Sequence, residues 1–207
     1  MGESNKATVV GRFTKGFTYS YCMHGENFYT TEIAAERLSG NYDYIPVTIS
    51  EHLIDTRENF TGEPVELVGD FRSYNKQGKN RSHLILTLMA QEITFVDDSE
   101  AFPEDKIFLD GFICKPPTYR RTPLGREIAE ILLAVNRPYE RSDYIPCICW
   151  GRNARWARKL PVGIGLTIHG RIQSREYGKE SKMAYEVSIN NMGVRINENS
   201  GIKAAQC

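Results

Sequence analysis

Hydrophobic and polar residues alternate along several stretches of the chain, with the period of two that is typical of β-strands. The stretch "SDYIPCICW" (142–150) puts Tyr144 and Trp150 on one face and Ile145 on the other. The same alternation runs through residues 163–177 and 182–196. One segment, 151–163, instead has apolar residues at helical spacing and ends in a proline and a glycine. The pattern therefore predicts strands interrupted by one short helix.

Short motifs recur at a spacing of about 100 residues along the chain. The motif "DYIP" occurs at 43–46 and again at 143–146. Gly11 recurs as Gly111, and Gly25 recurs as Gly125 at a predicted hairpin turn. Because the matches keep one order throughout, we infer two copies of one domain. The predicted domains are residues 1–100 and 101–207, with the acidic stretch "DDSEAFPED" (97–105) as the linker.

The order of the elements predicts the fold of each copy. Three strands, a helix and two more strands are the pattern of the five-stranded oligonucleotide/oligosaccharide-binding (OB) barrel. The helix is expected between strands three and four, in "SEHLIDTRENF" (50–60) and in 151–163. We therefore predict an all-β protein of two tandem OB-fold barrels, each with one short helix. Pro46 and Pro146 fall within the third strands, where proline implies an unpaired edge or a bulge.

The charges are distributed unevenly between the halves of the chain. The 207 residues carry no formal net charge. Residues 1–100 hold 9 Lys and Arg against 15 Asp and Glu, a net charge of −6, and residues 101–207 hold 17 against 11, a net charge of +6. Such asymmetry indicates a polyanionic partner for the basic half. The alternative is that two unlike surfaces attract each other.

Several classes of protein are not indicated by the sequence. There is no apolar run of the roughly 20 residues that span a bilayer, and no secretory signal, so we expect a cytoplasmic protein without a membrane partner. The five cysteines include no Cys-x-x-Cys pair, which favours free thiols and no metal site. The sequence has no Gly-rich phosphate loop, His-Glu-x-x-His or Gly-x-Ser-x-Gly motif, and its four histidines are scattered. We therefore expect no catalytic residues, no cofactor and no enzyme activity.

The second half resembles the bacterial single-stranded DNA-binding (SSB) protein family. The resemblance covers roughly residues 105–196. Its motifs are the first-strand glycine Gly111, "Tyr-x-x-Thr-Pro-x-Gly" at 119–125, "LAVNRP" at 133–138, "DYI" at 143–145 and "GRIQSR" at 170–175. The first half resembles the family more weakly, mainly through its likeness to the second. The resemblance implies sequence-nonspecific binding and protection of single-stranded DNA in replication, recombination and repair, in the bacterial cytoplasm or nucleoid.

Family members stack aromatic rings on unpaired bases, a contact that ignores sequence because every base has a π-face. Carried over by position, the expected stacking residues are Tyr139, Tyr144, Trp150 and Tyr177. Trp156 is expected to anchor the helix instead. Cations that contact phosphates should lie between the rings. The candidates are Arg120, Arg121, Arg137, Arg141, Arg152, Arg171, Arg175 and Lys179.

The first half lacks several of these residues. Ser50 stands in place of Trp150, Glu51 and His52 replace the Gly-Arg step that follows it, and Asp70 stands where Arg171 is expected. The residues that remain as weaker contacts are Tyr42, Tyr44, Arg72, Tyr74 and Lys76. We therefore expect the first barrel to bind weakly or to serve assembly.

The resemblance also bears on the partners. It implies that four barrels gather, which a homodimer of this chain would supply. The last residues, "NENSGIKAAQC", lack the acidic tip with which family members recruit replication proteins, so that role is not expected. Two alternatives stay open: a replication-restart or RNA-binding protein on the same fold, and an OB-fold subunit that serves protein contacts. Competition between DNA and RNA would separate the first, and lack of affinity for oligo-dT would favour the second.

Overall fold

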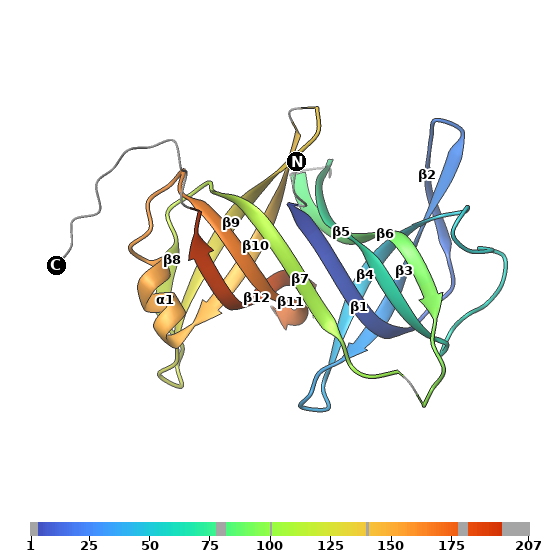
Figure 1. The fold of residues 1–207 in the computed structure, drawn as a ribbon, viewed down its shortest axis with the longest axis horizontal. Helices are drawn as coiled ribbons and strands as arrows, with labels where there is room; N and C mark the ends of the chain where they lie inside the picture. The colour runs from blue at the N-terminus through green and yellow to red at the C-terminus, as the bar shows by residue number, and fades with distance from the viewer. Residues whose placement is uncertain (1–3, 78–81, 100, 140, 178–181, 196–207) are drawn as a thin grey trace.

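The computed structural model describes residues 4–77, 82–99, 101–139, 141–177 and 182–195. The described chain is mostly β-strand with one short helix, as Figure 1 shows, which confirms the predicted all-β class. In chain order the elements are β1 (Asn5–Phe13), β2 (Thr18–Met23), β3 (Glu26–Glu36), β4 (Tyr42–Ser50), β5 (Pro64–Gln77), β6 (Ser82–Phe95), β7 (Asp105–Ile113), β8 (Thr118–Arg121), β9 (Glu127–Arg137), β10 (Arg141–Trp150), α1 (Gly151–Ala157), β11 (Gly165–Tyr177) and β12 (Lys182–Val194).

The strands of the first half pair in a closed ring. β1 pairs with both β3 and β5, β5 pairs with β6, β6 runs parallel to β4, and β4 pairs with β3. β2 joins the ring as the outer strand of a hairpin with β3. Gly25, in the turn of this hairpin, has a φ of 84°. A left-handed φ of this kind favours glycine, which confirms the predicted turn.

The second half repeats the same pairings one for one. β7 pairs with β9 and β11, β11 with β12, β12 in parallel with β10, and β10 with β9. β8 forms the matching hairpin with β9. The repeat seen in the sequence is thus a repeat of strand pairing. Among the described residues each half forms six strands, of which five close the ring and the sixth, β2 or β8, lies in the predicted hairpin segment.

Gly11 and Gly111 mark the point where each ring closes. Directly after Gly11, at Arg12, β1 ends its pairing with β5 and begins to pair with β3. A Cβ on Gly11 would lie 2.8 Å from the carbonyl oxygen of Ala34, and one on Gly111 would lie 2.5 Å from that of Ala134. Only glycine allows the two backbones to approach this closely, which explains why it recurs.

The interior of each ring is apolar, as the alternation predicted. Ile45 and Ile145 face the two interiors and are fully buried. Cys147 and Cys149 follow on the same face of β10, and both are buried. The four cysteines that the structure describes have free thiols. The fifth, Cys207, lies outside the described residues.

The helix predicted in the first half is wrong. Residues 51–61, all of which the structure describes, form turns. The Asp55 carboxylate accepts a hydrogen bond from the backbone N–H of Arg57 at 3.1 Å, and the Asn59 side chain accepts one from the N–H of Thr61 at 3.1 Å. Bonds of this kind offer the backbone an alternative to the helix. The helix of the second half does form, as α1, and ends six residues before the predicted stop at Gly163.

The prolines within the third strand of each repeat lie at an open strand edge. β4 pairs with β3 along its whole length but with β6 only at Val47 and Thr48, just after Pro46. β10 pairs with β12 only at Cys147 and Ile148, just after Pro146. Because a proline has no N–H to donate, it is tolerated where the neighbouring strand has diverged. The sequence indicated such an edge.

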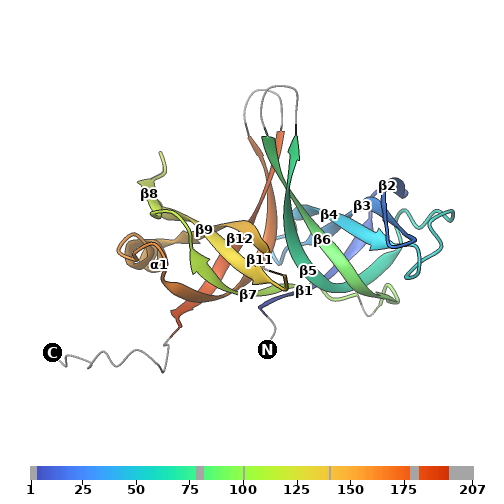
Figure 2. The same ribbon diagram turned by 90° about the horizontal axis from the view of Figure 1, so that it is seen from above.

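The two halves are joined through their first strands. Residues Asn5–Val9 of β1 pair antiparallel with Asp105–Leu109 of β7, so the pairing continues from one ring to the other (Figure 1). Residues 96–104, between β6 and β7, include no strand among those described. The hairpins β5–β6 and β11–β12 extend in the same direction from this junction (Figure 2).

Candidate nucleic-acid interface

Two of the predicted stacking residues lie on one face of β10. Tyr144 and Trp150 are 44% and 41% exposed, while the residues between them on the other face are buried in the core. We call the face of β10 that carries Tyr144, Pro146 and Trp150 the outer face of the second half. Because β10 pairs with β9 along its whole length, these rings project from a rigid strand.

A groove of about 400 Å³ adjoins this outer face at the junction between the halves. Tyr177 and Pro146 both line it, so Tyr177 borders the same surface as Tyr144 and Trp150. Tyr177 is 48% exposed. The structure therefore places Tyr144 and Trp150 on one face of β10, and Tyr177 at a groove that this face borders through Pro146.

The two remaining aromatic residues of interest lie elsewhere. Tyr139 is 94% exposed in the turn between β9 and β10, with a φ of 63° that non-glycine residues seldom adopt. Trp156 lies on α1 and is 38% exposed, so the helix does not bury it completely.

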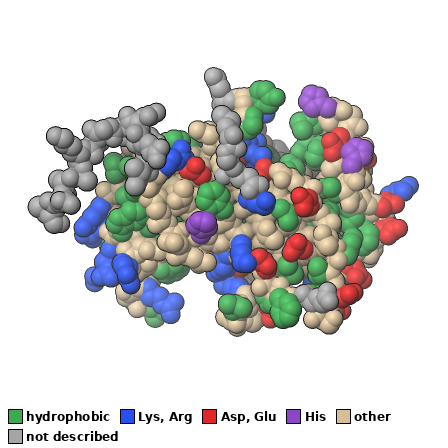
Figure 3. Space-filling view, viewed as in Figure 1, with side chains coloured by type: hydrophobic (Ala, Val, Ile, Leu, Met, Phe, Trp, Pro, Cys, Tyr) green, Lys and Arg blue, Asp and Glu red, His purple; other side chains and the backbone are tan. Residues whose placement is uncertain are grey.

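The predicted cations fall into two groups by their partners. Arg120, Arg121 and Arg175 form ion pairs with Glu130, Glu127 and Glu186 at 2.9, 3.7 and 3.0 Å, and keep substantial exposure. Arg141 and Arg152 are exposed. Figure 3 shows Lys and Arg gathered mainly over the second half on the face it views, with Asp and Glu mainly over the first. Lys179 lies outside the described residues, and so does the side chain of Lys76.

Arg137 and Arg171 belong to a second group, at the junction, where they neutralise buried carboxylates. Arg171 Nη1 lies 2.5 Å from Oδ2 of Asp43, which is 1% exposed. Arg137 Nε lies 3.3 Å from Oδ2 of Asp143, which is fully buried. A buried carboxylate needs such a partner, since transfer of an unpaired charge from water is costly. These two arginines therefore have a structural task in addition to any contact with nucleic acid.

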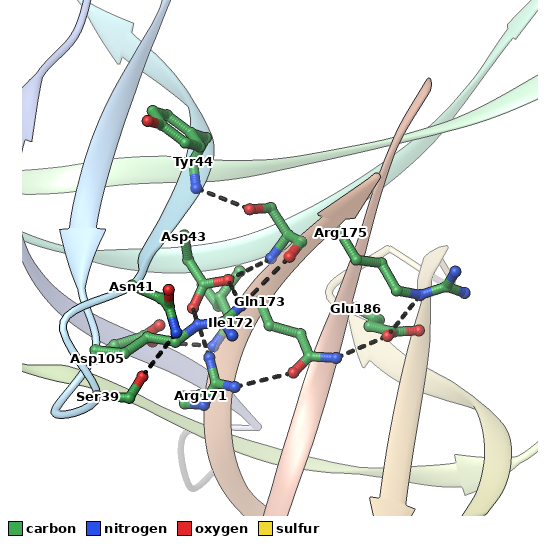
Figure 4. Close-up of polar contacts among 12 residues, drawn as sticks. Ser39, Asn41, Asp43, Tyr44, Asp105, Arg171, Ile172, Gln173, Arg175 and Glu186 are labelled. Atoms are coloured by element: carbon green, nitrogen blue, oxygen red, sulfur yellow. Dashed lines mark hydrogen bonds and ion pairs between the residues drawn. The ribbon is translucent and has the colours of Figure 1, made fainter. Parts of the chain in front are cut away.

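The repeated Asp-Tyr pair clasps the two halves together. Asp43 Oδ1 accepts the backbone N–H of Ser174 at 2.7 Å, and the N–H of Tyr44 donates to Oγ of Ser174 at 2.8 Å, as Figure 4 shows. In the equivalent contact from the second half to the first, Asp143 and Tyr144 bind Ser73 in the same way. The distances there are 2.7 Å and 2.6 Å. The sequence repeat pointed to this motif, but sequence reasoning missed that each copy binds the opposite half.

The clasp has consequences for the two tyrosines that follow the aspartates. Tyr44 and Tyr144 are held by their own backbone N–H groups against the other half, and their rings are 43% and 44% exposed. A residue whose backbone is fixed before binding loses less conformational freedom when a base stacks on its ring. The junction thus positions one exposed ring from each half.

Asn5 and Asp105 occupy equivalent positions at the start of β1 and β7, with one difference. Asn5 Nδ2 donates to the carbonyl of Phe71 at 2.8 Å, and its Oδ1 accepts the N–H of Phe71 at 3.0 Å. Asp105 Oδ1 accepts the N–H of Ile172 at 2.9 Å, but its buried Oδ2 has no hydrogen-bond partner among the described residues. Burial raises the pKa of Asp105 to about 7. Asp43 raises it further, and Arg171 and Arg37 oppose the shift.

The described ranges bear on two other kinds of site. No described helix is long and apolar enough to cross a membrane. No group of three or more His, Cys, Asp or Glu side chains there could hold a metal ion.

Comparison with known proteins places the chain in a family. The model of the "Single-strand binding protein family" matches residues 104–195. The chain is 30% identical over 110 residues to the single-stranded DNA-binding protein of Oceanobacillus iheyensis. The aligned region covers 49% of this chain and 68% of that protein. It is 34% identical over 93 residues to single-stranded DNA-binding protein 3 of Listeria innocua. This aligned region covers 41% of this chain and 58% of that protein. The chain belongs to the single-strand binding protein family.

Solved structures extend the likeness in fold to nearly the whole chain. The wild-type single-stranded DNA binding protein from Thermus aquaticus superimposes with a TM-score of 0.73 at 21% identity, over 96% of each chain. A deletion variant of the same protein gives a TM-score of 0.76 at 19% identity, over 95% of this chain and 97% of that one. The first half, which the family model does not match, therefore shares this fold as well.

Proposed function

We propose that the chain binds single-stranded DNA without sequence preference and protects it during replication, recombination and repair. One observation carries the proposal: Tyr144 and Trp150 are exposed on one face of β10 in the basic half, and Tyr177 is exposed at the groove that this face borders through Pro146. The family membership and the names of its bacterial relatives support it.

Binding would divide between two kinds of contact. The rings would stack on bases, each worth about 1–3 kcal/mol whatever the base. Exposed arginines would contact the phosphates between the stacked bases, and the proposed set is Arg120, Arg121, Arg141, Arg152 and Arg175. Tyr139 would extend the ring contacts beyond β10. No covalent chemistry is needed, so the function we propose is not enzymatic.

The same proposal covers the architecture. Each ring of strands would be an OB-fold barrel, with the domains divided at residues 100 and 101, and two chains would associate to gather four barrels. The closed pairing of five strands in each half supports the barrels, and the repeated motifs support the division into two domains. The bacterial relatives favour action in the bacterial cytoplasm.

Tryptophan fluorescence tests this function directly. Both tryptophans, Trp150 and Trp156, lie in the second half. Titration with oligo-dT at two salt concentrations should quench the fluorescence, because a stacked base contacts the indole of Trp150. The affinity should fall steeply as salt rises, because neutralised phosphates release counterions. Lack of quenching at low salt would overturn the proposal, and stronger binding of oligo-rU than of oligo-dT would favour an RNA-binding role.

A further inference from the structure

The first half carries an aromatic pair that the sequence did not single out. Tyr21 of β2 stacks on Phe28 of β3, with ring centroids 4.9 Å apart and planes 17° from parallel. Phe28 is 8% exposed, whereas Tyr21 is 36% exposed. Phe28 is nevertheless not one of the side chains of the core cluster. The pair is therefore a small apolar cluster outside the core, in which Tyr21 is partly exposed to solvent.

A one-residue bulge decides which way Tyr21 points. Tyr19 pairs with Tyr29 and Tyr21 pairs with Phe28, with the register shift between them at Ser20. Tyr29 and Phe28 are neighbours on β3, and neighbours on a strand point to opposite faces. Tyr19 and Tyr21 therefore also lie on opposite faces, although residues two apart in a regular strand share a face.

Tyr21 lies on the same face as Tyr44. Phe28 pairs with Ser50 of β4, and Ala34 pairs with Tyr44, so these side chains share the outer surface of β3 and β4. In the second half the same positions are held by Ile128, opposite Trp150, and by Ala134, opposite Tyr144. The outer faces of the two halves thus correspond strand by strand.

The comparison shows where the missing ring of the first half lies. In the second half Arg120 pairs with Ile128, and Trp150 pairs with Ile128 from the other side. In the first half the corresponding places are taken by Tyr21 and Ser50 around Phe28. The first half therefore has its aromatic side chain on β2 and not at the end of β4, and a tyrosine stands there in place of the arginine.

The surroundings of Tyr21 are acidic rather than basic. The hydroxyl of Ser50 donates to the carboxylate of Glu26, which lies at the start of β3. Burial raises the pKa of Tyr21, and the charges of Tyr74 and Glu26 raise it further. A ring in such surroundings can stack on a base, but the carboxylate repels a phosphate.

The groove at the junction connects the two outer faces. Pro46 and Pro146 both line it, and each shares a face of its strand with Tyr44 or Tyr144. Leu84 and Leu86 of β6 and Met183 of β12 are among its other apolar lining residues. Figure 2 shows the two hairpins that contain these residues extending on the same side of the junction. An extended strand that leaves Trp150 past Tyr144 can therefore cross to Tyr44 without leaving the surface.

We propose that Tyr21 is a base-stacking residue for the part of the same single strand that crosses the Pro46–Pro146 groove onto the first half. This rests on the function proposed above. The first half then adds bases to the site by stacking alone, without a phosphate contact at Tyr21. Its contribution is insensitive to salt, whereas binding to the second half depends on it.

Oligo-dT of increasing length tests the proposal with the full chain. Tyr21→Ala is compared with Tyr19→Ala, which removes the same side chain from the opposite face of the same strand. For the shortest oligonucleotides that saturate the Trp150 fluorescence change, both variants should bind like the wild type. For longer ones, Tyr21→Ala should lose about tenfold in affinity, the worth of one stacked base, at every salt concentration. Tyr19→Ala should lose none.

The outcomes separate this inference from the proposed function on which it rests. Wild-type affinity of Tyr21→Ala at every length overturns the further inference and leaves the proposed function standing. Absence of oligo-dT binding by the wild type overturns both. Should Tyr21→Ala fail to fold, Tyr21→Phe and Tyr21→Leu decide instead: Phe keeps the ring and should bind like the wild type, whereas Leu keeps only an apolar side chain. Equal affinity of these two variants for long oligo-dT contradicts stacking at this position.

Discussion

The two halves of the molecule share one arrangement of strands and differ in the side chains on their outer faces. Their strands pair in the same order, and each sends an aspartate and a tyrosine N–H to a serine of the other half. On the outer faces, by contrast, the second half combines Trp150 with Arg120, and the first combines Tyr21 with Glu26. The difference teaches that a ring for stacking and a cation for phosphates can be lost or kept independently on the same strands.

The largest effects should come from the features that the halves have in common. Asp43→Ala and Asp143→Ala each leave partly buried arginines and a buried serine without their partner, so each should lower the free energy of unfolding by about 3–5 kcal/mol. Urea denaturation measures the loss. Asp98, whose ion pair with Arg12 is exposed, is the control, and Asp98→Ala should change stability little. A large loss from one junction aspartate only would show that the clasp is not shared by both halves.

The next effect concerns a polar difference between the halves at their junction, Asn5 against Asp105. The pKa of Asp105 is about 7 in the folded chain, against an ordinary value of 3.8. The folded state thus keeps a proton that the unfolded state releases, so this group's contribution is complete below pH 3.8 and is lost as pH rises through about 7.

Asp105→Asn should remove this pH dependence. The amide would donate to the carbonyl of Ile172 as Asn5 does to that of Phe71, and should stabilise the chain by about 1–3 kcal/mol at pH 8. Asn5→Asp should do the reverse in the first half. Urea denaturation at pH 5 and pH 8 measures both. Variants whose stability follows the wild type in parallel at both pH values would mean that Asp105 stays charged when folded.

The smallest effects should come from single cations. Arg120→Ala and Arg152→Ala should each reduce the slope of log affinity for oligo-dT against log salt by about 0.7, the value for one phosphate contact on a single strand. Quenching at saturation should stay unchanged, because the ring of Trp150 remains. Arg57, on an exposed turn of the first half, provides the control. A slope change from Arg57→Ala as large as theirs would contradict the assignment of phosphate contacts to the second half.

Local patterns predicted most of the fold, because a strand that buries one face must alternate its residues. Alternation along 142–150 and 163–177, and the repeat of Asp43 at Asp143, indicated the strands and their duplication. The helix expected at 50–60 did not form, because Asp55 and Asn59 bind their own backbone and favour turns. Composition and spacing do not reveal that competition.

The candidate site was less accessible to sequence reasoning. Tyr144 and Trp150 could be placed on one face, since they are six residues apart on a regular strand. Tyr21 could not, because the bulge at Ser20 reverses its face and no local signal marks a bulge there. The contact of Asp43 with Ser174 joins residues 131 positions apart, and a repeat says only that a motif recurs, not which residue it binds.

The most direct test of the account compares one ring from each half. Trp150→Ala and Tyr44→Ala should be titrated with the same long oligo-dT at the same salt concentration, and their affinities compared with that of the wild type. The account predicts that Trp150→Ala loses about tenfold or more and that Tyr44→Ala loses clearly less, because only the second half has a ring at the end of its third strand, with Arg120 on the other side of Ile128. Equal losses from the two substitutions would contradict it.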